Sequence, residues 1–457
     1  MSTVKIPQPA PSWDLSPAQI NDKVQTALES AARMFAELAN VKLPTVETAA
    51  YVLEVKTAKN VDNVNSFLND LREKLKPASA DNWRPLKKLK EQECKELGNF
   101  YDGELYSQDL CYYEQKLLRD NFSVDEEETA QYFPLEHTIK FMLDTYNTLF
   151  RHNFVEETEP ATRNVWHEDD KQYSVWKMDD WDAPQFTGWL YFDLHPRDGK
   201  FGHLACFDNV YTDMSEEGSR VYPVTSLVCN FSNPSKEKPA LLKHYEVQAF
   251  FHELGHGSHK LLCAPELCCS SSWVPRDFIE APSQMLEYWI WRKDVITDLS
   301  KHETGERIPE SLVDCMVKSK RANAAIDNLI QVLALLDMAV HKHVGSYETL
   351  DLNALWNNLC EDVILIKNPE PTRAYCSFSH IVEGYAAGYY GYQWSKVFAA
   401  DMYFSRFEKA HLDPTLGKLY GDTIIARGGL YEMEDNLGEF LDREPNNEAY
   451  LRDQGLA

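Results

Sequence analysis

The sequence lacks the features of a membrane-spanning, secreted or nucleic-acid-binding protein. It contains no apolar run of about eighteen or more residues, and its first residues have no apolar signal segment. Basic residues are scarce: the 457-residue chain has 46 Lys and Arg against 72 Asp and Glu, a net charge of -26. Nucleic acids and anionic membranes both require a basic surface. We therefore expect a cytoplasmic protein whose partners include neither nucleic acid nor membrane.

The sequence also lacks internal repeats, low-complexity linkers and a regular cysteine pattern. Its ten cysteines are irregularly spaced, which favours reduced thiols over a disulfide framework. Cys263, Cys268 and Cys269 follow a histidine-rich stretch and are alternative metal ligands. A closed site of Cys and His would leave no open position for catalysis, so we interpret these three as structural thiols.

The most informative segment is residues 249–259, which contain an H-E-x-x-H motif in a run typical of a helix. His252 and His256 are four residues apart, so on a helix they share one face and can bind one zinc ion. Glu253 follows the first histidine, where its carboxylate can take a proton from zinc-bound water. The motif predicts metal-assisted hydrolysis.

The flanking residues support this interpretation over a helix with two incidental histidines. Apolar residues upstream recur at helical spacing and predict that the helix is buried on its other side. A catalytic zinc site takes three protein ligands and keeps one position open. Glu280, at the start of a second predicted helix, is the expected third ligand of a single zinc ion.

The periodicity predicts a mainly α fold with a small β-sheet. Helices are expected at residues 16–40 (with Ser16 and Gln19 as a capping box), 64–74, 86–97, 108–121, 245–262, 279–299, 312–343 and 393–410. Within these, residues 324–339 are apolar on most sides and predict a buried helix. Strands are expected at 173–178, 188–194 and 226–231. We divide the chain into an N-terminal helical segment (1–60), a helical lobe (61–160) and a zinc-binding catalytic region (161–457).

Four segments together resemble the thimet oligopeptidase-like zinc metallopeptidases, peptidase family M3. They are residues 193–203, 251–256, 277–287 and 384–395. The likeness runs from about Leu68 to the C-terminus. It implies a two-lobed helical fold with a small sheet beside the zinc helices and a central cleft.

The resemblance also implies roles for individual residues. His252, His256 and Glu280 are again the zinc ligands, and Glu253 is the general base. A tyrosine-rich loop that closes over substrate adds further catalytic and substrate-binding residues: His380, Tyr385, Tyr389 and Tyr392. Residues 225–231 resemble the strand that pairs with extended peptides. The expected substrate-binding residues outside the loop are Arg276, Val228 and Asn230.

The chain departs from the family pattern in two places. A long helical segment is expected to be missing, with the junction at residues 55–64, and the tyrosine loop has fewer glycines, which predicts a stiffer loop. Two functions therefore stay open: an oligopeptidase, or a repurposed zinc enzyme acting on a small non-peptide molecule as an amidase, lyase or cyclase. A non-enzymatic scaffold is disfavoured by the intact motif. The sequence does not indicate an oligomeric state.

Overall fold

The structure is a computed structural model of the 457-residue chain. It describes residues 6–11, 16, 19, 25 and 46–456, with gaps at 123, 179–182, 215–217, 237, 264–273, 321–323, 344–346, 370, 382–383 and 430. Side chains are not described for residues 46–61, 121–122, 213, 324–328 and 347 either.

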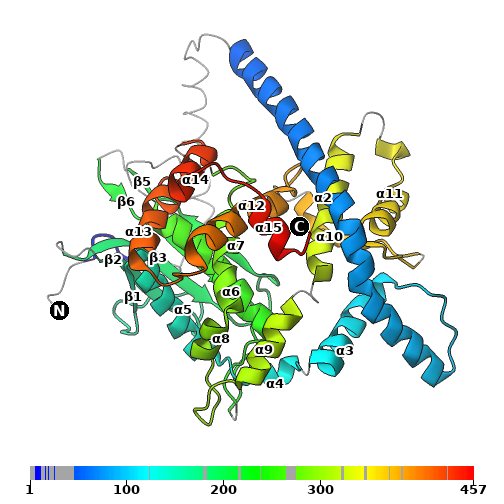
Figure 1. The fold of residues 1–457 in the computed structure, drawn as a ribbon. Helices are drawn as coiled ribbons and strands as arrows, with labels where there is room; N and C mark the ends of the chain where they lie inside the picture. Colours follow the sequence, from blue (N-terminus) through cyan, green and yellow to red (C-terminus); the bar gives the residue numbers. More distant parts are fainter. Residues whose placement is uncertain are drawn as a thin grey trace.

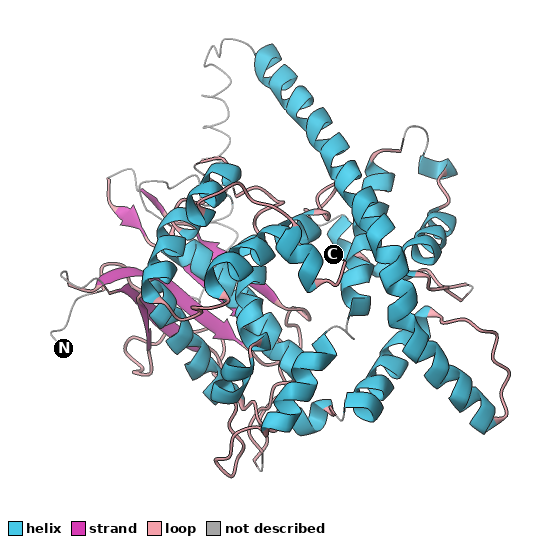
Figure 2. Ribbon diagram, viewed as in Figure 1, coloured by secondary structure: helices cyan, strands magenta, loops and turns pink. Residues whose placement is uncertain are grey.

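A five-stranded mixed sheet lies on one side of the molecule, in the order β1-β2-β3-β7-β4 (Figures 1 and 2). Only β3 and β7 are parallel; the other neighbours are antiparallel. The strands are β1 (His152–Glu156), β2 (Lys171–Lys177), β3 (Gln185–Asp193), β4 (Ala205–Val210) and β7 (Val224–Val228), and β5 (Asp213–Met214) and β6 (Arg220–Val221) form a separate pair. The three strands expected from the sequence are β2, β3 and β7, whereas β1 and β4 were not expected.

Helices make up most of the remainder, so the predicted fold class is confirmed. They are α2 (Val46–Leu97), α3 (Leu110–Phe122), α4 (Glu126–Ala130), α5 (Leu135–Phe150), α6 (His244–Leu262), α7 (Ala281–Glu287), α8 (Lys293–Leu299), α9 (Glu310–Ser319), α10 (Ala324–His341), α11 (Leu352–Leu359), α12 (Gly391–Met402), α13 (Pro414–Tyr420), α14 (Met433–Leu441) and α15 (Glu448–Asp453). The single helix expected at 279–299 is instead α7, a 3-10 turn at Tyr288–Trp291 and α8.

The described residues form two main hydrophobic cores. The larger core joins the sheet to α5, α6, α7 and the C-terminal helices. The second core joins α2 to α10, α11 and the π-helix Cys360–Ile364, on the right in Figure 1. Residues of α2 contribute to both cores. The cores combine segments far apart in the sequence, and the division at residues 60 and 160 stays a prediction.

Helix α2 differs from the sequence-based expectation of two shorter helices. It runs through Pro77 and Pro85, each of which removes a backbone hydrogen bond from the helix interior. Tertiary contacts hold the intervening turns: the Trp83 indole donates to the carbonyl of Ile364, and the Ser79 hydroxyl donates to that of Val363. The backbone of α2 also continues through the expected junction at residues 55–64.

Most of the helix expected at residues 16–40 lies outside the described residues, as do Cys268 and Cys269. The predicted capping box is formed, because the Ser16 amide donates to Gln19 Oε1 (2.8 Å) and the Gln19 amide donates to Ser16 Oγ (3.3 Å). Across the described part of the chain, no helix combines the length and hydropathy needed to span a bilayer.

Candidate metal centre

The centre is built on α6, which lies between the sheet and α7. Its buried face includes Phe250, Phe251 and Leu254, so the motif histidines point to the opposite side, as the periodicity predicts. Close packing requires glycine at position 255, because an added Cβ would lie 2.6 Å from Ser283 Cα in α7. This approach brings the start of α7, where Glu280 is the N-cap residue, up to the histidines.

Three side chains converge there, as the sequence predicts. His252 Nε2 and His256 Nε2 are 3.1 Å apart, and Glu280 Oε2 lies 3.2 Å from the first and 3.1 Å from the second. The three atoms therefore form a nearly equilateral triangle. Within the described residues, this is the one cluster of His, Cys, Asp or Glu whose ligand atoms could hold a metal ion.

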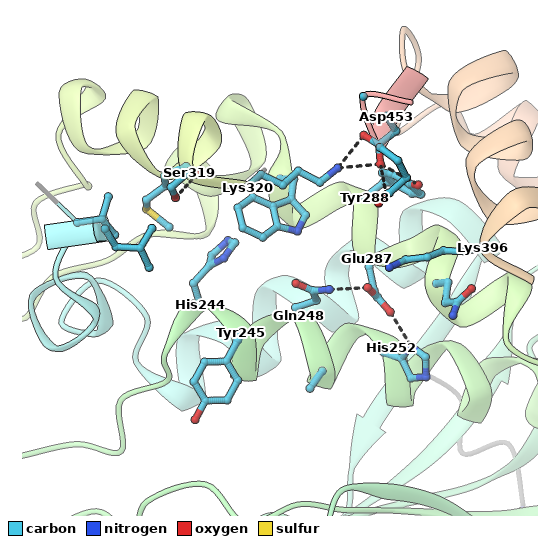
Figure 3. A pocket seen from close by; sticks show the side chains of 18 of the residues that line it. His244, Tyr245, Gln248, His252, Glu287, Tyr288, Ser319, Lys320, Lys396 and Asp453 are labelled. Carbon is cyan, nitrogen blue, oxygen red and sulfur yellow. Dashed lines mark hydrogen bonds and ion pairs between the residues drawn. The ribbon is translucent and has the colours of Figure 1, made fainter. Parts of the chain in front are cut away.

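Glu287 supports the centre from behind, a role that the sequence analysis did not assign. Its Oε1 lies 2.7 Å from His252 Nδ1, and its Oε2 accepts a hydrogen bond from Gln248 Nε2 (2.5 Å; Figure 3). The Nδ1 contact leaves Nε2 of His252 to face the other two ligands. A carboxylate behind a ligating histidine fixes its orientation and raises its basicity. The sequence feature that could have identified Glu287 is its position seven residues after Glu280, two helical turns along α7.

Buried charges are balanced within the cluster. Burial alone would raise the pKa of Glu280, but the adjacent histidines His256 and His252 outweigh it and hold that pKa well below its usual range. Burial would likewise lower the pKa of His252, but Glu280 and Glu287 outweigh it and raise that pKa well above its usual value. The carboxylates thus stabilise positive charge at this position.

Glu253 lies beside the ligands and lines a cavity of about 600 Å³ together with His252. Figure 3 shows this cavity with His252 and Glu287 at its wall. The other walls come from α2, α9, α12 and the C-terminal helix, including Ala78, Lys320 and Asp453. The charge of Glu253 also acts on the sheet. Burial raises the pKa of Cys206 in β4 to about 12, and the charge of Glu253 adds to this rise. This cavity is the expected cleft, and it lies next to the candidate base.

The structure brings all four residues predicted from the tyrosine loop together beside Glu280. The Tyr385 hydroxyl donates to Glu280 Oε1 (2.8 Å), and its ring stacks on Tyr392 with centroids 5.2 Å apart. The His380 ring lies 5.4 Å from Tyr385 and 5.5 Å from Tyr389. Burial, and then the charge of Glu280, raises the pKa of both Tyr385 and Tyr389 to about 12, so both hydroxyls stay protonated at neutral pH.

Arg276, expected to bind substrate, lies against this loop. Its guanidinium carbon is 4.5 Å from the centroid of the Tyr385 ring, a cation–π contact. Its Nη2 would be 3.6 Å from a Cβ at Gly384, and its carbonyl only 2.7 Å from a Cβ at Gly391. The residue therefore packs closely under the tyrosine turn, and substrate binding by it stays a prediction.

Strand β7 is not available for main-chain pairing with a peptide, which corrects that expectation for Val228; substrate binding by Asn230 stays a prediction. β7 pairs with β3 on one side and with β4 on the other, where Val228 is opposite Ala205. The Asn230 amide donates to the carbonyls of Phe201 and His203, so it holds the loop that leads into β4. The sheet edge beside the centre is β4, a strand that the sequence analysis missed.

Comparison with known proteins identifies the family. The model of peptidase family M3 matches residues 15–456. The chain belongs to peptidase family M3. It is 47% identical to saccharolysin of Saccharomyces cerevisiae over 414 residues, which cover 89% of this chain and 58% of that protein.

Two other relatives match this M3 chain over a similar share of its length. It is 35% identical to thimet-like oligopeptidase of Dictyostelium discoideum (89% of this chain, 61% of that protein) and 34% identical to oligopeptidase A of Haemophilus influenzae (88% and 58%). The M3 chain thus spans about three fifths of the length of these relatives.

Proposed function

We propose that this chain is a zinc-dependent peptidase that hydrolyses short peptides. The observation that carries the proposal is the triangle of His252, His256 and Glu280, with Glu253 adjacent on the same helix and a cavity beside it. The names of the relatives, saccharolysin and oligopeptidases, support peptides as the substrate class.

The donor atoms fit zinc. Bonds of about 2.1 Å to three corners of a tetrahedron place the ligand atoms about 3.4 Å apart. The observed separations of 3.1–3.2 Å are close to this value. Two imidazoles and one carboxylate also match the ligand set of catalytic zinc sites in metallopeptidases. Bound zinc supplies Lewis acidity, which lowers the pKa of water and polarises a carbonyl.

The chain's own residues then divide the remaining work. Glu253 accepts the proton of the attacking water and delivers it to the leaving amine, as a general base and then acid. Glu287 keeps His252 in the tautomer that presents Nε2 to the metal. Tyr385 and Tyr389 supply hydroxyls that donate to the developing oxyanion, an interaction worth about 3 kcal/mol for one good donor.

We propose that the substrate aligns along the β4 edge of the sheet and not along β7. A peptide that extends the sheet at β4 gains main-chain hydrogen bonds without a requirement for particular side chains. It would also lie near Glu253, whose charge reaches Cys206 on β4. This arrangement suits an extended peptide, and no contact in the described residues favours the non-peptide alternative.

The test is incubation of zinc-loaded protein with a library of short and medium peptides, read by mass spectrometry. Glu253→Gln removes the base but no ligand, so it should retain zinc and lose turnover by orders of magnitude. Glu246→Gln is the matched control, because it makes the same change on the same helix away from the cavity.

Cleavage by the wild type and by Glu246→Gln, but not by Glu253→Gln, would establish the peptidase. No cleavage by zinc-loaded wild type, or equal cleavage by Glu253→Gln, would overturn the proposal.

A further inference from the structure

We infer that Asp337 is a positioning residue for the tyrosine turn, which we define as residues 384–391. This inference rests on the proposed function, because it concerns how the turn meets the metal ligands. Asp337 lies in α10, a helix of the second core, and its side chain is fully buried. It interrupts a segment that is otherwise largely apolar.

A buried carboxylate is costly unless its oxygens accept hydrogen bonds. Here both oxygens accept from the backbone of the turn: Oδ1 from the amide of Ala387 (2.9 Å) and Oδ2 from that of Tyr389 (3.0 Å). His341, one helical turn later, places its Nδ1 2.9 Å from Oδ1. Hydrogen bonds to a charged acceptor are stronger than neutral ones, so this carboxylate is a strong anchor for the turn.

The turn requires such an anchor because its backbone is unusual. Ala387 has φ 54°, in the left-handed region that alanine rarely adopts, and Gly384 has φ 89°. Ala387 is exposed, so packing of its side chain does not fix the conformation. The Asp337 carboxylate accepts hydrogen bonds from the amides of residues 387 and 389. It therefore fixes the backbone at Ala387, the strained residue, and just after it.

The anchor positions a contact between the two cores. The Tyr389 ring packs in the second core, and Tyr385 packs at its margin. The Tyr385 hydroxyl nevertheless reaches Glu280, which begins α7 in the first core. Arg276 holds the opposite side of the turn through the Tyr385 ring. Asp337 therefore sets where the Tyr385 and Tyr389 hydroxyls lie relative to the metal ligands, although it touches none of the ligands itself.

The first experiment measures the anchor without using activity. Asp337→Asn has nearly the same shape, but its amide group can accept from only one of the two backbone amides. Hydrogen exchange followed by mass spectrometry should show faster exchange in a peptide covering residues 384–391. Asp401→Asn is the matched control: Asp401 is also buried and accepts from a backbone amide, that of Asn446, and from Arg443, at the far end of α12.

The second experiment measures turnover of the best peptide from the library. We expect Asp337→Asn to lower kcat at least about tenfold with a change in KM below about threefold, because misplaced hydroxyls are felt in the transition state. Asp401→Asn should leave kcat near the wild-type value.

Unchanged exchange in Asp337→Asn would overturn the anchor even if the protein proved not to be a peptidase. Faster exchange with unaltered kcat, or an equal kcat loss in Asp401→Asn, would overturn the positioning role while leaving the proposed function intact.

Discussion

Gly255 is the position where the packing of two helices most directly sets the geometry of the metal centre. A Cβ at this position would lie 2.6 Å from Ser283 Cα and 3.1 Å from Ser283 Cβ. The nearest obstacle is backbone, so it cannot rotate away. Ordinary contact begins near 3.4 Å, and Gly255→Ala must therefore separate α6 from α7 by about 0.8 Å.

The separation acts on both metal affinity and stability. Ligand distances are tolerated only within about 0.2 Å, so moving Glu280 away from the histidines should weaken zinc binding at least about tenfold. Overpacking against backbone costs about 3 kcal/mol, and the better helix propensity of alanine returns about 1 kcal/mol. The net loss in the free energy of unfolding is about 2 kcal/mol.

Gly257→Ala is the matched control on the same helix. Its Cβ would meet Leu227 Cδ1 at 3.2 Å, the far end of a side chain that can rotate. Zinc affinity is measured by competition with a chelator, and stability by urea unfolding of the metal-free protein. If Gly255→Ala bound zinc as tightly as Gly257→Ala and the wild type, close helix approach would not be what places Glu280.

Two further predictions concern the tyrosine turn and a buried histidine. Tyr385→Phe should lower kcat by about a hundredfold with little change in KM if the hydroxyl acts on the transition state, and a change confined to KM in steady-state kinetics would make it a binding residue. Burial lowers the pKa of His244 to about 4 from its usual 6.5, so the folded state disfavours the charged ring. Stability is complete above pH 6.5 and falls as the pH drops towards 4, by at most about 3 kcal/mol. His244→Phe should flatten this dependence in urea unfolding measured between pH 7 and 4.5, and an unchanged slope would contradict the assignment.

The parts of the centre that the sequence predicted are those fixed by local spacing. His252 and His256 are on one helix face because they are four residues apart, and Glu280 was found because it begins the next helix. Glu287 was harder to assign, since its role depends on how α7 lies against α6. The role of Asp337 could not be assigned from its local sequence, because the backbone amides that it binds are about fifty residues away.

The errors in the fold have the same origin. β4 contains Asp208 and Asn209, which are poor strand formers, and it is a strand because its backbone completes the sheet beside β7. β7 was expected to be the substrate edge from the family resemblance, and nothing in its own residues indicates that β4 covers it. In α2, local propensity favours a break at each proline, but Trp83 and Ser79 hold the helix together through contacts with residues near 364.

The two prolines of α2 also bracket the part of the helix that lines the cavity. Ala78, Asp81 and Asn82, which line the cavity, lie between Pro77 and Pro85, neither of which can donate a backbone hydrogen bond. The helix nevertheless continues as one rod through this stretch (Figure 1), and Ser79 and Trp83 bond to the carbonyls of Val363 and Ile364. This wall of the cavity is therefore held in place by contacts with the second core.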